Sequence, residues 1–152
     1  MTIVATISFV VGGAAAVEDL ARRRISNWTT GAALVSGFVI HAIRAGWRGA
    51  ASAGTGALVG FAIFLVFYLL HGMGAGDLKL MAGFGSLLGP LVILYAAWTA
   101  AVAGGVMGLA YTAVLAWRAR WRAPRGPAAT AETIPYAPAI VAGAWLAEFA
   151  LG

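Results

Sequence analysis

Long apolar runs, separated by short polar segments, extend from the first residues of the chain to the last. A helix needs about 20 apolar residues to cross the hydrocarbon core of a bilayer, and somewhat fewer when neighbouring helices bury it. Six runs approach this length, and the fourth is short. They cover about residues 3–17, 28–43, 50–70, 78–88, 91–117 and 134–151. The pattern predicts an all-α polytopic membrane protein, built as a bundle of about six transmembrane helices.

Glycine and proline mark the boundaries and contact surfaces of these predicted helices. Gly89-Pro90 divides the fourth run from the fifth. Proline cannot continue the hydrogen-bond ladder of a helix, so we expect two separate helices here or one broken helix. Closely spaced glycines indicate helix contacts, because small residues let helix backbones approach one another in lipid. They are Gly54, Gly56 and Gly60 in the third run and Gly104, Gly105 and Gly108 in the fifth.

The composition supports a membrane location. Hydrophobic residues make up 62% of the chain and charged residues 10%, whereas roughly 25% of the residues in an average soluble domain are charged. The mean hydropathy is +0.90. A chain of 152 residues is too small to hide so much apolar surface in a water-soluble globule. Membrane lipid is therefore expected to cover much of it.

Several kinds of chemistry are excluded by composition. The chain has no cysteine, which removes disulfides, thiolate zinc sites and cysteine nucleophiles. Neither His41 nor His71 has a carboxylate at metal-ligand spacing. We therefore predict no metal site and no cofactor. The first run lacks a basic start and a small-residue cleavage site, so we interpret it as a retained span and not as a removable signal peptide.

Basic residues divide the predicted loops into two sets. The net charge is +5, but the arginines stand in short clusters between apolar runs, which is typical of cytoplasmic loops and not of nucleic-acid-binding surfaces. One set holds eight basic residues and the other holds two. The first comprises Arg22, Arg23, Arg24, Lys79, Arg118, Arg120, Arg122 and Arg125, and the second Arg44 and Arg48. This bias places the first set in the cytoplasm and both termini outside.

Acidic residues carry the candidate chemistry, because an ionisable group at membrane depth is costly and is usually functional. There are five: Glu18, Asp19, Asp77, Glu132 and Glu148. The first apolar run ends at Asp19 and the fourth begins at Asp77. The topology therefore puts both at the same cytoplasmic boundary, where they can face each other if the two spans are neighbours. On a helix, Glu18 points about 100° away from Asp19.

Two facing carboxylates can perform acid–base catalysis without a metal, thiol or serine. They cannot both ionise cheaply, so one keeps a proton while the other is charged. The charged member can take a proton from water, and the neutral member can polarise a carbonyl and later protonate a leaving amine. In Gly74-Ala75-Gly76-Asp77, the glycines leave room for a peptide backbone beside the acid. A compatible interpretation is a turn in which Asp77 is the N-cap of the next helix.

Three segments resemble motifs of type IV prepilin peptidases and the related archaeal preflagellin peptidases. G-A-G-D-L-K-L at 74–80 is similar to the family motif G-x-G-D-x-K-L. E-D-L-A-R-R-R-I-S-N at 18–27 is similar to the first aspartate motif, although Ser26 stands where the family often has proline. T-I-P-Y-A-P-A-I at 133–140 resembles the proline-bracketed motif before the last span. Presenilin-type proteases also share G-x-G-D, but their first acid lies in a different context.

The resemblance implies an aspartic endopeptidase of the cytoplasmic membrane. Its expected substrate is a type IV prepilin or pseudopilin, cut at the cytoplasmic face between a leader peptide and the hydrophobic helix of the pilin. Asp19 and Asp77 carry over as the catalytic pair. Further residues carry over as motif members that support the site or bind substrate: Gly74, Gly76, Lys79, Pro135 and Tyr136. For Lys79, a lysine that merely extends to the cytoplasmic boundary is an equal alternative.

The resemblance also predicts the domain organisation. Longer members of the family have an N-terminal cytoplasmic domain with four cysteines and methylate the new N-terminus of the pilin. This chain resembles the short, peptidase-only form that accompanies tight-adherence (Flp-type) pili. We therefore expect residues 1–152 to form one membrane-embedded peptidase domain, without a separate methyltransferase or zinc domain.

Two other functions are compatible with a small membrane protein. A proton or cation transporter subunit would carry acids along a pathway through the bilayer, whereas here both candidates lie at one face. A non-catalytic membrane subunit of a pilus or secretion machine would tolerate Asp77→Asn. The positions of the acids favour the peptidase.

Overall fold

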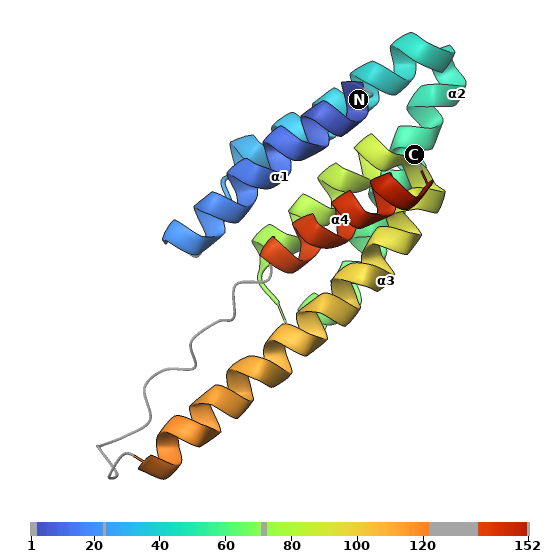
Figure 1. Cartoon of the computed structure of the whole chain (residues 1–152). Coiled ribbons are helices and arrows are strands. Elements are labelled where there is room, and N and C mark those ends of the chain that lie inside the picture. The colour runs from blue at the N-terminus through green and yellow to red at the C-terminus, as the bar shows by residue number, and fades with distance from the viewer. Residues whose placement is uncertain (1–2, 23, 71–72, 122–136, 152) are drawn as a thin grey trace.

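Four α-helices make up the described part of the chain. The structure is a computed structural model that describes residues 3–22, 24–70, 73–121 and 137–151. The helices are α1 (Ile3–Arg22), α2 (Asn27–Leu69), α3 (Ala75–Trp121) and α4 (Ala137–Leu151) (Figure 1). Helices α1 and α2 and most of α3 are long and apolar enough to cross a membrane, and α4 is a shorter apolar helix. The prediction of an all-α polytopic membrane protein is confirmed.

The predicted count of about six helices is wrong for the described residues. Two predicted boundaries are local breaks inside α2 and α3. In α2 the break lies at Ala45 (φ −138°, ψ 17°) and Gly46 (φ 56°, ψ −137°), and in α3 it lies at Gly89 (φ 79°, ψ 173°). Glycine adopts positive φ at little cost, and Pro90 can open a new helical turn because its missing N–H has no role there. The chain therefore changes direction without forming a loop.

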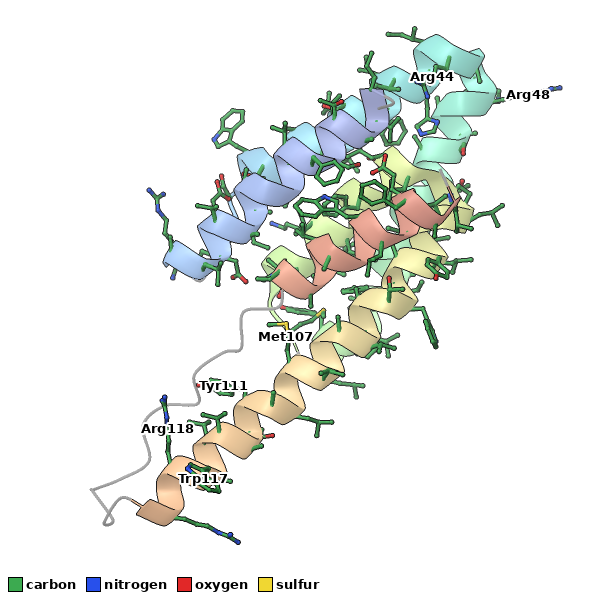
Figure 2. All side chains as sticks on the ribbon, viewed as in Figure 1. Arg44, Arg48, Met107, Tyr111, Trp117 and Arg118 are labelled. Atoms are coloured by element: carbon green, nitrogen blue, oxygen red, sulfur yellow. The ribbon has the colours of Figure 1, made fainter. Side chains whose placement is uncertain are left out.

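The break in α2 turns the chain back toward the rest of the bundle. A straight helix of 43 residues would measure about 65 Å, whereas the hydrocarbon core of a bilayer is only about 30 Å thick. Figure 1 shows the first half of α2 beside α1 and a sharp turn at the end of the bundle. Arg44 and Arg48 lie at this turn, whereas Arg118 lies at the opposite end, on α3 (Figure 2).

Helices α2 and α3 form the largest contact in the fold, and α4 packs on α3. The backbones of α2 and α3 lie close together at Gly56 and Gly85, where a Cβ on either residue would overlap the backbone carbonyl oxygen of the other. The predicted contact role of Gly56 is thus confirmed. That of Gly105 is wrong, because a Cβ there would meet nothing within 4 Å. The largest fully buried apolar side chains come from α2, α3 and α4, and they are Phe64, Leu80, Met81, Phe84, Leu87, Ile93 and Ile140.

Hydrogen bonds tie three helices together at the end of the bundle where α1 stops. Glu18 of α1 accepts hydrogen bonds from the backbone N–H of Ser26 (2.8 Å) and the hydroxyl of Thr29 (3.0 Å). Ser26 is the N-cap of α2. Lys79 of α3 donates to Asn27 Oδ1 over 3.0 Å. These bonds fix the first turns of α2 and α3 relative to the last turn of α1. Of the two candidate aspartates, Asp19 lies in that last turn of α1 and Asp77 lies in the first turn of α3.

Candidate active site

The two candidate aspartates occupy helix ends that pack at the same end of the bundle. Asp19 lies in the last turn of α1, and Asp77 lies in the first turn of α3. Each side chain is only 7% exposed. Burial of a carboxylate is costly unless hydrogen bonds replace its contacts with water. The partners of these two groups therefore determine whether the site is stable.

Asp77 reaches back to the residue that precedes its own helix. The backbone N–H of Gly74 donates to Asp77 Oδ2 over 3.2 Å. Because α3 begins at Ala75, Gly74 is at the N-cap position and Asp77 is the third helical residue, as in the acidic half of a capping box. The prediction that Asp77 is itself the N-cap is therefore wrong by three residues. The bond holds the carboxylate against the glycine-rich segment.

Asp19 is held by the start of another helix. The backbone N–H of Ala137, the first residue of α4, donates to Asp19 Oδ2 over 3.2 Å. The first N–H groups of a helix lack partners within the helix, and the helix dipole favours an anion beside them. The buried carboxylate on α1 thus obtains a donor from a residue 118 positions later in the chain.

Asp19 and Asp77 line one cavity, with a volume of about 270 Å³. The other lining residues come from the turn before α2 and from the segment around the start of α3. They are Arg24, Ile25, Gly74, Ala75 and Gly76. The structure therefore brings together four of the predicted site residues, the two acids and the two glycines of the second motif.

Of the other predicted motif residues, the structure describes Lys79. Lys79 is exposed and is not among the residues that line this cavity. Its ammonium group donates to Asn27 Oδ1, and both residues border a separate hollow between α2 and α3. Pro135 and Tyr136 lie outside the described residues. Lys79 therefore links two helices beside the site and is not part of the cavity wall.

Three residues that shape the site were not predicted from the sequence. Arg24 and Ile25 line the cavity, and Glu18 fixes the turn that carries them through its bonds to the start of α2. A Cβ on Gly76 would lie 3.3 Å from Ile25 Cβ, so the glycine lets this turn approach α3 closely. The signal was present, because all three missed residues belong to the first aspartate motif.

The described residues offer acid–base chemistry at this site. Among them, no group of three or more His, Asp or Glu side chains has the arrangement of a metal site. What the cavity presents is a pair of carboxylates, each oriented by a backbone N–H. Such a pair can exchange protons with water and with the groups of a peptide bond.

These features define a class of protein: a polytopic helical membrane protein in which two buried aspartates from different helices line one cavity. The sequence model of the type IV leader peptidase family matches residues 6–109. The chain belongs to the type IV leader peptidase family, and the predictions of a prepilin peptidase and of an enzyme are confirmed at that level. No curated protein and no solved structure matches the chain.

Proposed function

We propose that this protein is an aspartic endopeptidase that uses Asp19 and Asp77 to remove the leader peptide from type IV prepilins. One observation carries the proposal: both carboxylates are buried, yet both line one cavity. Membership of the leader peptidase family gives the reaction class. The catalytic roles of the two residues and the finer substrate choice are our proposal.

The reaction begins with a dyad that shares one proton, because two nearby carboxylates ionise one after the other. The charged aspartate takes a proton from water as the water oxygen attacks the carbonyl carbon of the scissile peptide. The protonated aspartate donates a hydrogen bond to the carbonyl oxygen. When the tetrahedral intermediate collapses, the C–N bond breaks and a proton passes to the leaving amine. The N–H groups of Gly74 and Ala137 keep the two carboxylates oriented.

The remaining motif residues support the site in this proposal. Gly74 and Gly76 border the cavity without side chains, which leaves space for the backbone of the substrate. Lys79 keeps the first turn of α3 in register with the first turn of α2 through Asn27. For Pro135 and Tyr136, which precede α4, we propose a role in positioning Ala137 against Asp19.

We further propose that the site faces the cytoplasm. Arg22 lies in the last turn of α1, as Asp19 does, and Arg24 lines the cavity. Arg44 and Arg48 lie at the turn inside α2, at the other end of the bundle (Figure 2). Basic residues are more frequent in cytoplasmic loops, which supports this orientation.

The substrate is proposed to be a prepilin of the Flp type. The support comes from the motif resemblance to the short, peptidase-only members of the family. A prepilin has its leader in the cytoplasm and its hydrophobic helix in the membrane, so its scissile bond reaches the depth at which Asp19 and Asp77 lie. Membrane lipid surrounds the complex.

Co-expression with an Flp-type prepilin tests the proposal. Asp19→Asn and Asp77→Asn should each reduce the rate at which the shorter, cleaved pilin appears by about 10²- to 10⁴-fold, the usual contribution of a general acid or base. Glu148→Gln is the matched control, because it makes the same acid-to-amide change on α4 outside the cavity and should leave cleavage unchanged. Normal cleavage by either aspartate variant would contradict the two-acid mechanism.

A further inference from the structure

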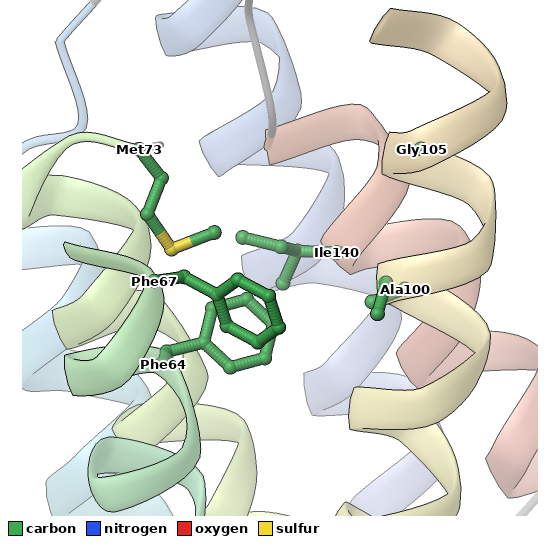
Figure 3. A pocket seen from close by; sticks show the side chains of 7 residues that line it. Phe64, Phe67, Met73, Ala100, Gly105 and Ile140 are labelled. Carbon is green, nitrogen blue, oxygen red and sulfur yellow. The ribbon is translucent and has the colours of Figure 1, made fainter. Parts of the chain in front are cut away.

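A second cavity lies between α2, α3 and α4, and its wall is apolar. It has a volume of about 160 Å³ and is lined by Phe64 and Phe67 of α2, Met73 and Ile140, together with small residues of α3. Figure 3 shows Phe64, Phe67 and Met73 on one side of the space, and Ile140 and α3 on the other. No titratable side chain lines it, and an apolar group would leave no polar group buried without a hydrogen bond there.

Two residues that line this cavity are close in sequence to the residues whose N–H groups donate to the aspartates. Met73 directly precedes Gly74, whose N–H donates to Asp77. Ile140 lies three residues after Ala137, whose N–H donates to Asp19, and three residues correspond to about one helical turn, or roughly 5 Å along the axis. The two cavities therefore share the backbone segments that hold the dyad, and they share no lining residue.

The second cavity is closed at its base and exposed at its rim. Phe64 and Ile140 at its base are 2% and 1% exposed, respectively. At its rim, Phe67 is 40% exposed, and Ala101 and Gly105 are also exposed. An apolar group carried by a membrane helix can thus enter sideways, without passing through water.

We propose that this cavity is a specificity pocket for one apolar side chain of the substrate, located within the first four residues after the scissile bond. The proposal rests on the proposed function, because it places the scissile bond at the dyad and the membrane segment of the prepilin beside α3. An apolar cavity of roughly 150 Å³ accommodates a benzene ring, so the size of this pocket suits a side chain such as phenylalanine or leucine.

Gly105 provides a direct test. Gly105 lines the pocket, and a Cβ at this position would meet nothing within 4 Å, so the backbone leaves room for a side chain in Gly105→Leu, which should narrow the pocket. Gly13→Leu is the matched control, because Gly13 on α1 also has nothing within 4 Å of a Cβ and lies outside both cavities. Phe67→Ala changes the pocket in the opposite direction by enlarging it.

The measurement is cleavage in detergent of prepilins that carry alanine, leucine, phenylalanine or tryptophan at each of the first four positions after the scissile bond. At one position, the wild-type enzyme should prefer leucine or phenylalanine to alanine. Gly105→Leu should reduce this preference by about 10- to 100-fold, in the range that one or two methylene groups give in an apolar pocket. Phe67→Ala should shift the preference toward tryptophan, and Gly13→Leu should retain the wild-type pattern.

The outcomes separate the two proposals. If Gly105→Leu and Phe67→Ala both keep the wild-type size preference, or if the wild-type enzyme has none, the pocket assignment is overturned and the catalytic role of Asp19 and Asp77 stands. If Asp77→Asn cleaves these prepilins at the normal rate, the proposed function fails, and the pocket assignment fails with it.

Discussion

The carboxylate of Asp19 accepts a hydrogen bond from the backbone N–H of Ala137, so the last described helix completes the environment of an acid on the first. The first and last helices of the described chain thus meet at the candidate site. The contact also explains how a carboxylate that is only 7% exposed is tolerated, since a helix N-terminus provides both a donor and a favourable dipole.

Ala137→Pro should reduce cleavage by about 10- to 100-fold. Proline removes the N–H that donates to Asp19, and a hydrogen bond to a charged group contributes about 1.5–3 kcal/mol. The first position of a helix tolerates proline, so α4 should persist. The measurement is the initial rate of prepilin cleavage, and Ala137→Gly is the control because it keeps the N–H. Equal rates for the two variants would show that the bond does not matter.

Thr29→Val should destabilise the protein by about 1.5 kcal/mol, at the lower end of the range for a hydrogen bond to a charged group. The Thr29 hydroxyl donates to Glu18 and joins the start of α2 to the end of α1. The unfolding free energy in detergent measures the effect. Thr55→Val is the control, since the Thr55 hydroxyl donates only to carbonyl groups of its own helix. The same loss in both variants would argue against the inter-helix role of Glu18.

Gly85→Ala should destabilise the contact between α2 and α3 by about 1–3 kcal/mol, the usual cost of overpacking a tight core. The added methyl group would overlap the carbonyl oxygen of Gly56. At Gly54, by contrast, a Cβ would lie 3.5 Å from the Phe38 ring, an ordinary contact. Gly54→Ala should therefore leave the unfolding temperature nearly unchanged, and a drop as large as that of Gly85→Ala would refute the steric argument.

Arg48→Cys and Arg118→Cys should be labelled from opposite sides of the membrane. The native chain has no cysteine, so each variant carries a single thiol, and the two residues lie at opposite ends of the bundle (Figure 2). A membrane-impermeant maleimide should label Arg48→Cys in intact cells and Arg118→Cys only after the cells are opened. Labelling of Arg118→Cys in intact cells would reverse the proposed orientation.

Two physical signals in the sequence predicted the helical membrane class and the location of Asp19 and Asp77 at the same boundary. Apolar run length reports the thickness of the bilayer, and the distribution of arginine assigns loops to sides. Both signals are local, so one sequence is enough to detect them. Membership of the leader peptidase family was predicted from three motifs, and the first two lie within residues 6–109, which the family model matches.

Features that depend on packing could not be predicted in this way. A glycine at positive φ, such as Gly46, replaces a loop with a break inside α2, and composition does not distinguish the two. Gly56 and Gly105 each belong to a group of closely spaced glycines. Of these two residues, Gly56 packs against the backbone of another helix, whereas Gly105 has nothing within 4 Å of a Cβ. The hydrogen bond from the N–H of Ala137 to Asp19 depends on how α4 packs against α1. No local sequence pattern encodes this packing.

The link between Asp19 and Ala137 also has a consequence for biosynthesis. The chain is made from its N-terminus, so Asp19 is synthesised 118 residues before its donor. At about 5–20 residues per second, this interval is roughly 6–24 s. During that time the unfinished enzyme lies among newly made prepilins without this hydrogen bond. A chain that stops before Ala137 should therefore cleave prepilins at least about 10- to 100-fold more slowly than the full chain, the loss expected when this hydrogen bond is missing.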